Sequence, residues 1–122
     1  MSAERLTEAR NVWLSTVRPD GRPHLTPIWF VWHAERFWIC TGAEFVKTRN
    51  VRRDSRVSVA LEDGNAPVVA EGRVTVHARP YPEAVVTAFR AKYSWDISTP
   101  DEDGAYDALL EVVVDRWLWG AP

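Results

Sequence analysis

The chain has 122 residues, of which 46% are hydrophobic and 26% charged, and its net charge is −2. This length and composition predict one globular domain over residues 1–122, large enough for its own core. The charge balance argues against nucleic acid binding through bulk charge, and no run approaches the roughly 18 apolar residues of a membrane span.

The sequence lacks the motifs of several common kinds of functional site. The single cysteine, Cys40, cannot form an internal disulfide, and the first five residues hold no apolar signal core, so we expect a cytoplasmic protein. His24, His33 and His77 lack metal-ligand spacing, and no metal is predicted. The glycines are too far apart for a phosphate-binding loop, and no Gly-x-Ser-x-Gly motif is present.

The first third of the chain predicts a short helix followed by strands. Residues 4–10 suit the helix, and a strand over 11–18 ends at Pro19-Asp20-Gly21, a sequence typical of a tight turn. A second strand over 23–32 would complete a hairpin, and a third is predicted over 36–41.

The remainder alternates between helix and strand signals. We expect a helix over 44–53, and another that starts near Pro82 and places Val85, Val86, Phe89 and Tyr93 on one face. Period-two patterns predict strands over 56–62, 68–77 and 109–118, with a short helical turn over 101–108.

The resulting fold class is mainly β, with six strands and flanking helices. Most connections have hairpin length, which favours an antiparallel sheet closed into a small barrel. Residues 28–32 and 112–114 are apolar on both sides of their strands. A second copy of the chain could cover the outer side, so we expect a homodimer.

The connection from strand to helix at residues 41–54 carries the clearest chemical signal. A helix N-terminus offers unpaired N–H groups and a partial positive charge. Lys47 adds a full charge, and Asn50 lies three residues further on the same helix surface. Four arginines (49, 52, 53 and 56) make the segment strongly basic. It is either an anion site or simply a solvated basic helix.

Four stretches of the chain resemble the pyridoxamine 5'-phosphate oxidase-like family, whose members bind flavins or deazaflavins in a split barrel. They are Leu-Ser-Thr-Val-Arg-Pro-Asp-Gly-Arg-Pro at 14–23, Pro-Ile-Trp-Phe at 27–30, Lys-Thr-Arg-Asn-Val-Arg-Arg-Asp at 47–54 and Glu-Gly at 71–72. The third is the most specific. The resemblance covers nearly the whole chain and implies a six-stranded antiparallel split barrel.

The resemblance also implies a homodimer with a cofactor at the subunit interface. The second strand would run beside the cofactor ring, and the strand-to-helix segment would take its phosphate. The cofactor-binding residues implied are His24, Pro27, Ile28, Trp29, Thr41, Lys47, Asn50 and Arg53. The short motif looks most like the actinobacterial branch that uses coenzyme F420, whose long anionic tail suits the excess of arginine. FMN is the alternative cofactor.

A reductase that passes a hydride from the cofactor to a small conjugated or unsaturated substrate is the function this resemblance implies. Such chemistry belongs to the cofactor and needs no catalytic triad. We assign no catalytic residue, although His24 and Tyr93 are conceivable proton donors. Trp29, Phe30 and Trp32 could wall the substrate side, or could belong to the core or the dimer interface.

Three alternatives remain open. The chain could be an FMN-dependent oxidase, although it ends at Trp-Leu-Trp-Gly-Ala-Pro (117–122) without the basic, His-containing segment of true pyridoxamine phosphate oxidases. It could store or carry a flavin, deazaflavin or haem without turnover. It could also be an interaction module that uses its tryptophan-rich strands.

Overall fold

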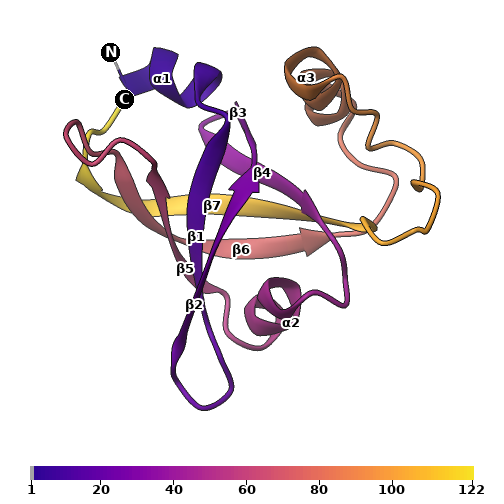
Figure 1. The fold of residues 1–122 in the computed structure, drawn as a ribbon, viewed down its shortest axis with the longest axis horizontal. Helices are drawn as coiled ribbons and strands as arrows, with labels where there is room; N and C mark the ends of the chain where they lie inside the picture. Colours follow the sequence, from indigo (N-terminus) through magenta and orange to yellow (C-terminus); the bar gives the residue numbers. More distant parts are fainter. Residues whose placement is uncertain (1) are drawn as a thin grey trace.

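The computed structural model describes residues 2–122, which form seven strands and three helices (Figure 1). The helices are α1 (Ser2–Glu8), α2 (Val46–Arg53) and α3 (Glu83–Tyr93). The strands are β1 (Asn11–Val17), β2 (Pro23–Trp29), β3 (Val31–His33), β4 (Arg36–Thr41), β5 (Arg56–Leu61), β6 (Val69–His77) and β7 (Ala108–Trp119).

All seven strands belong to one sheet in the order β2-β1-β5-β6-β7-β4-β3, and every neighbouring pair is antiparallel. Figure 1 shows the β1–β2 hairpin crossing the β6–β7 pair steeply, so the sheet is strongly curled. Helix α2 packs against β1 and β6, whereas α3 packs against β3. The predicted antiparallel, mainly β architecture is confirmed.

The core lies on the concave side of the sheet because the strands alternate buried and exposed side chains. In β1, Val12, Leu14 and Thr16 are buried, whereas Trp13 points outward. A second cluster forms between α3 and the edge of the sheet, and it contains all four residues predicted for the helix face: Val85, Val86, Phe89 and Tyr93.

The prediction of six strands is wrong by one. The strand expected over 23–32 is interrupted at Phe30 and becomes β2 and β3. The Phe30 N–H donates to the Tyr93 hydroxyl oxygen at 3.0 Å, and the Phe30 carbonyl accepts from Lys92 Nζ at 3.0 Å. Side chains at the end of α3 therefore form hydrogen bonds with the Phe30 backbone groups. In a continuous strand these groups would bond to the neighbouring strand.

The helical segments differ from the prediction in three places. Helix α1 spans Ser2–Glu8 rather than residues 4–10. Helix α2 begins at Val46 rather than at residue 44, because Phe45 is extended and its N–H bonds to the Gly42 carbonyl in a turn. The helical turn expected over 101–108 is reduced to one hydrogen-bonded turn, in which the Gly104 N–H donates to the Asp101 carbonyl at 3.0 Å. There the Asp103 carboxylate accepts from the Ala105 N–H at 3.0 Å, and such side-chain bonds compete with a helix.

Within residues 2–122, no helix is long and apolar enough to cross a membrane. The same residues contain no group of three or more His, Cys, Asp or Glu side chains placed to hold a metal ion.

Candidate functional site

The connection between β4 and α2 is fixed by close backbone packing. A Cβ on Gly42 would lie 2.3 Å from the Ala105 carbonyl oxygen and 2.8 Å from the Phe45 ring, so a side chain has no room there. The next residue, Ala43, donates its N–H to Asp107 Oδ1 at 2.7 Å. The loop before β7 thus sets where the first turn of α2 begins.

Lys47 lies in that first turn and is a buried cation. Its side chain is 9% exposed, and its ammonium lies 5.2 Å from the centre of the Phe45 ring. Among the described residues no carboxylate pairs with it, and burial lowers its pKa. A buried charge without a partner is costly, so this arrangement favours an anion that comes from outside the chain.

Hydroxyl groups without partners surround the start of α2. Thr41, at the end of β4, and Thr48, beside Lys47, are fully buried, yet neither Oγ1 has a hydrogen-bond partner within residues 2–122. Buried polar atoms are nearly always bonded, so these two suit an external ligand that carries oxygen atoms. The residues present therefore fit a phosphate-bearing group.

Asn50, one turn further along α2, is satisfied internally. It is buried, and its Nδ2 donates to Thr16 Oγ1 of β1 at 3.0 Å. This bond ties α2 to the sheet and uses one of the donors that the sequence analysis assigned to a cofactor.

An aromatic cavity of about 520 Å³ opens between β2 and the segment that precedes β7. It is lined by Asn11, Pro27, Ile28, Trp29, Cys40, Trp95 and Tyr106. Burial raises the pKa of the Cys40 thiol to about 12, so that wall is neutral. No charged side chain lines the cavity, which suits the uncharged, planar part of a ligand.

A basic cavity of about 490 Å³ lies between the β1–β2 hairpin and α2. Four arginines supply its charge, and only Arg22 among them has a carboxylate partner in the described chain, Asp20 at 2.8 Å. The complete lining is Arg18, Pro19, Asp20, Arg22, Val46, Arg49, Asn50 and Arg53. This cavity suits an anionic group that reaches solvent.

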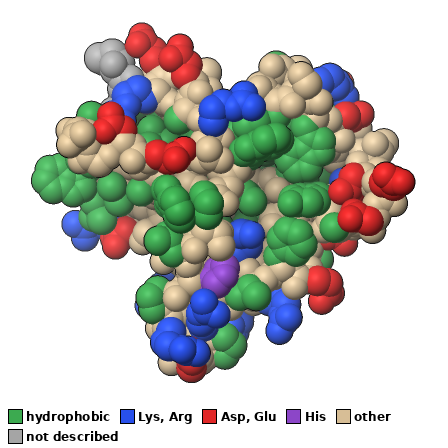
Figure 2. Space-filling model, in the orientation of Figure 1, with side chains coloured by type: hydrophobic (Ala, Val, Ile, Leu, Met, Phe, Trp, Pro, Cys, Tyr) green, Lys and Arg blue, Asp and Glu red, His purple; other side chains and the backbone are tan. Residues whose placement is uncertain are grey.

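Lys47 itself lines neither cavity, but neighbouring residues relate it to both, and Val46, which precedes it, lines the basic cavity. Phe45, which its ammonium approaches, meets Tyr106 of the aromatic cavity edge to face, with ring centres 5.3 Å apart. On the other side, burial and the charges of Arg18 and Lys47 lower the pKa of His24. Figure 2 shows hydrophobic side chains gathered below α3 and cations gathered around the β1–β2 hairpin, on the same face of the molecule.

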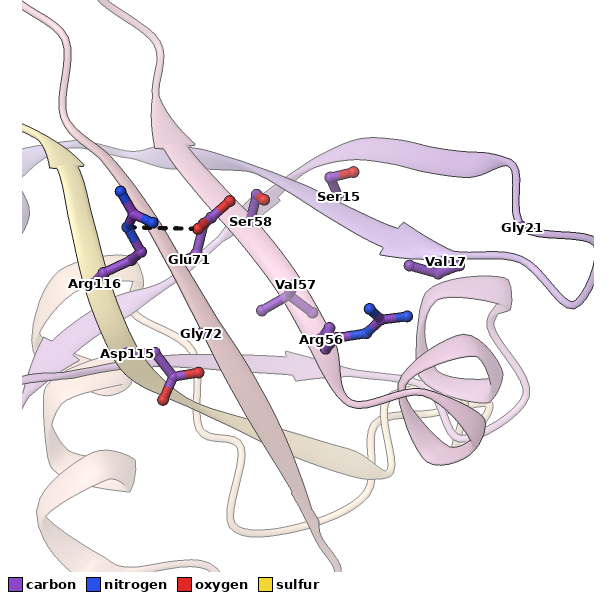
Figure 3. Close-up of a pocket in the computed structure, with 10 residues that line it drawn as sticks. All are labelled: Ser15, Val17, Gly21, Arg56, Val57, Ser58, Glu71, Gly72, Asp115 and Arg116. Atoms are coloured by element: carbon purple, nitrogen blue, oxygen red, sulfur yellow. Dashed lines mark ion pairs between the residues drawn. The ribbon is translucent and has the colours of Figure 1, made fainter.

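A third cavity, of about 570 Å³, lies on the outer side of the sheet (Figure 3). Its charged groups are paired with each other or with neighbours: Arg116 with Glu71 at 3.9 Å, Asp115 with Arg73 at 2.9 Å and Arg56 with Asp54 at 2.8 Å. It therefore offers little uncompensated charge to a ligand.

The predicted site residues fall into three groups. Pro27, Ile28 and Trp29 line the aromatic cavity, whereas Asn50 and Arg53 line the basic one. Lys47, His24 and Thr41 line neither cavity, although His24 is electrostatically coupled to Lys47.

The side chain of Arg53 also donates to the Val17 carbonyl of β1. Five of the eight predicted residues therefore line one of these two cavities.

Of the alternatives left open for Phe30 and Trp32, the structure places both residues in or against the core. Phe30 is fully buried in the core against Phe37, and Trp32 packs against Phe37 and Trp117 away from the aromatic cavity. Trp95 and Tyr106, which no sequence pattern indicates, line the aromatic cavity together with Trp29. They lie in the irregular segment between α3 and β7, where no periodicity indicates the direction of a side chain.

The curled antiparallel sheet with a helix inserted after β4 defines a split barrel. Solved structures share this fold: an F420 reductase at 24% identity (TM-score 0.73, covering 93% of this chain and 94% of that one) and a conserved hypothetical protein from Mycobacterium tuberculosis at 29% identity (TM-score 0.73, 94% and 79%). The heme storage protein HutZ from Vibrio cholerae, at 18% identity, has a TM-score of 0.77 and coverage of 96% and 90%.

The family model for pyridoxamine 5'-phosphate oxidase matches residues 2–119. The chain therefore belongs to the pyridoxamine 5'-phosphate oxidase-like family of split barrels. No curated protein matches it. The family includes flavin and F420 oxidoreductases and also non-catalytic members, so the particular activity has to be argued from the site.

Proposed function

We propose that this chain binds an anionic flavin-type cofactor, coenzyme F420 or alternatively FMN, and acts as an oxidoreductase on a small conjugated or unsaturated substrate. The observation that carries the proposal is Lys47, a buried cation without a counter-charge in the described chain. Its helix lines the arginine-rich cavity, and its neighbour Phe45 contacts Tyr106 of the uncharged aromatic cavity. A ligand with a planar ring and an anionic tail would match these surfaces, with its ring in the aromatic cavity and its tail in the arginine-lined one.

Each part of the site would then meet one part of the cofactor. Lys47, with the hydroxyls of Thr41 and Thr48, would hold the phosphate, and Pro27, Ile28 and Trp29 would lie against the ring. Arg53 and its neighbours in the basic cavity would meet further anionic groups, which favours the longer tail of F420 over the single phosphate of FMN.

A bound cofactor of this kind supplies hydride transfer, and the protein supplies placement. The aromatic walls would exclude water from the ring. Tyr93 is not available as a proton donor, because its hydroxyl bonds to Phe30 and Arg10 and burial raises its pKa. Burial and the charges of Arg18 and Lys47 lower the pKa of His24, which disfavours the protonated imidazole that a proton donor needs. We assign the proton to solvent.

We further propose that the working unit is a homodimer. An apolar row crosses the outer side of five adjacent strands, because the register pairs Pro27 with Trp13, Trp13 with Ala60, Ala60 with Val69 and Val69 with Trp119. Trp13 and Trp119 are 37% and 63% exposed. Such a contiguous apolar surface is typical of an interface, and a second copy would cover it by two-fold symmetry.

The first test is equilibrium titration of the purified protein with F420 and with FMN, followed by fluorescence. We expect both dissociation constants to be measurable and the one for F420 to be lower. The reduced cofactor is then mixed with enones, quinones, nitroaromatics and tetrapyrroles, and its oxidation is followed by absorbance. Tight binding with no turnover on any acceptor would favour a storage or carrier protein instead.

The second test removes the proposed phosphate ligand. Lys47→Ala should weaken cofactor binding by about 1.5–3 kcal/mol, the range of a hydrogen bond to a charged group. Arg52→Ala is the control, because Arg52 is exposed on the same helix and lines neither cavity. Equal affinity in a folded Lys47→Ala variant, or equal losses in both variants, would reject this placement of the phosphate.

A further inference from the structure

The interruption between β2 and β3 is held by the end of α3. The Tyr93 hydroxyl accepts the Phe30 N–H at 3.0 Å, and its own hydrogen faces two carbonyl oxygens, those of Phe30 and Arg10, each at 2.8 Å. One hydroxyl hydrogen serves one of these carbonyls at a time. Lys92 Nζ also reaches the Phe30 carbonyl, at 3.0 Å.

The ring of the same tyrosine holds the residue before the interruption. Tyr93 and Trp29 are stacked, with ring centres 4.4 Å apart and planes inclined by 8°. Trp95 meets Trp29 edge to face at 5.9 Å. Trp29 nevertheless remains 42% exposed and lines the aromatic cavity. The Tyr93 ring therefore covers one face of the indole, while part of the Trp29 side chain stays exposed to solvent.

Cations reinforce this cluster from the side of α1 and α3. The Arg10 guanidinium lies 4.5 Å from the centre of the Tyr93 ring, and its Nη1 donates to the Lys92 carbonyl at 2.8 Å. The Lys92 ammonium lies 4.0 Å from the centre of the Phe30 ring. The Arg10 guanidinium also lies 5.8 Å from the centre of the Trp29 ring, so a cation borders the indole, but neither Arg10 nor Lys92 lines the aromatic cavity.

We propose that Tyr93 is a positioning residue that fixes the Trp29 indole as a stacking surface for the planar, uncharged part of the ligand. Holding an aromatic platform in place before binding reduces the ordering cost when a ring stacks on it. The identity of the ligand rests on the proposed function, whereas the fixing of Trp29 is a property of the chain alone and is testable without ligand.

The chain offers a matched pair of variants. Tyr93→Phe keeps the ring and loses the hydroxyl bonds to Phe30 and Arg10. Tyr81→Phe is the control, because Tyr81 lies in the same buried cluster with the same 8% exposure, and its hydroxyl has no hydrogen-bond partner in the described chain.

The first readout is ¹⁹F NMR of protein labelled with 5-fluorotryptophan, with the Trp29 resonance assigned by Trp29→Phe. We expect this resonance to shift or broaden in Tyr93→Phe and to stay unchanged in Tyr81→Phe. An unchanged Trp29 resonance in folded Tyr93→Phe protein would overturn the proposal. If Tyr93→Phe does not fold, Lys92→Met removes a single bond to the same carbonyl and should move the resonance in its place.

The second readout is binding of lumiflavin, a flavin ring without phosphate. Tyr93→Phe should weaken it about 5- to 10-fold, the effect of one or two uncharged hydrogen bonds, while Tyr81→Phe should leave it unchanged. Equal lumiflavin affinity despite a shifted Trp29 resonance would overturn the stacking role, and so would wild-type protein that binds no lumiflavin. Failure of the phosphate placement appears separately, as cofactor affinity that does not respond to Lys47→Ala.

Discussion

The Asn50 side chain stabilises the fold, although the sequence predicts that it binds a cofactor. Its amide donates to the buried Thr16 hydroxyl, which joins α2 to β1. Removing it leaves a buried hydroxyl without that donor, so Asn50→Ala should lower the free energy of unfolding by about 1–3 kcal/mol. Urea denaturation followed by circular dichroism measures this change.

A double-mutant cycle with Thr16→Val separates the bond from other effects of the substitution. If the two side chains stabilise each other, Asn50→Ala should cost less in the Thr16→Val background than in the wild type. Additive losses would contradict this structural role. A large loss of cofactor affinity with unchanged stability would instead support Asn50 as a ligand.

At single positions, the role of a residue can be predicted from the sequence where that role depends on its immediate neighbours along the chain. A lysine in the first turn of a helix, preceded by Gly42, is sufficient to suggest an anion site. The sequence does not reveal that Lys47 is buried without a counter-charge, since that depends on packing. Trp95 and Tyr106 could not be placed at all, because long-range contacts rather than a local period fix the loop that carries them.

At the scale of elements, strands and helices with clear periodicity lie close to their predicted bounds. The largest error, the continuous strand over residues 23–32, has a specific cause. The backbone groups of Phe30 bond to Tyr93 and Lys92, more than sixty residues away in sequence. The strand propensity of residues 23–32 does not depend on these distant partners. The interruption at Phe30 is therefore visible only in the tertiary structure.

The Glu-Gly pair at residues 71–72 also has an explanation at this scale. A Cβ on Gly72 would lie 2.2 Å from the Val113 carbonyl oxygen of β7, next to an irregularity in the β6–β7 register. The glycine therefore permits close approach of two strands, and this contact explains Gly72 without any contact to a ligand.

Gly72→Ala should consequently destabilise the protein by about 1–3 kcal/mol, the usual cost of overpacking. Gly64→Ala is the matched control, because a Cβ there meets nothing within 4 Å and the residue has no positive φ. Thermal unfolding of the two variants beside the wild type measures the difference. Equal melting temperatures for Gly72→Ala and Gly64→Ala would show that the strands can separate at little cost.

At the scale of the molecule, the apolar row across the outer side of the sheet makes assembly testable. Placing a charge within this row should oppose association, because burying an unpaired carboxylate is costly. We expect Trp13→Glu to reduce the mass in solution from twice 13.9 kDa to the single-chain value, as measured by analytical ultracentrifugation. If the cofactor lies at the subunit interface, its affinity should fall in the same variant.

Val46→Glu is the control for the mass measurement, since Val46 is an exposed apolar residue of α2 (44%) and lies away from the row. Val46 lines the basic cavity, so cofactor affinity is not compared in this variant. It should leave the mass unchanged. A wild-type protein that sediments as a monomer, or a Trp13→Glu variant that remains a dimer, would contradict the assignment of this surface to a second copy. A cofactor bound equally well by monomeric Trp13→Glu protein would place the complete site within one chain and remove the subunit interface from the proposal.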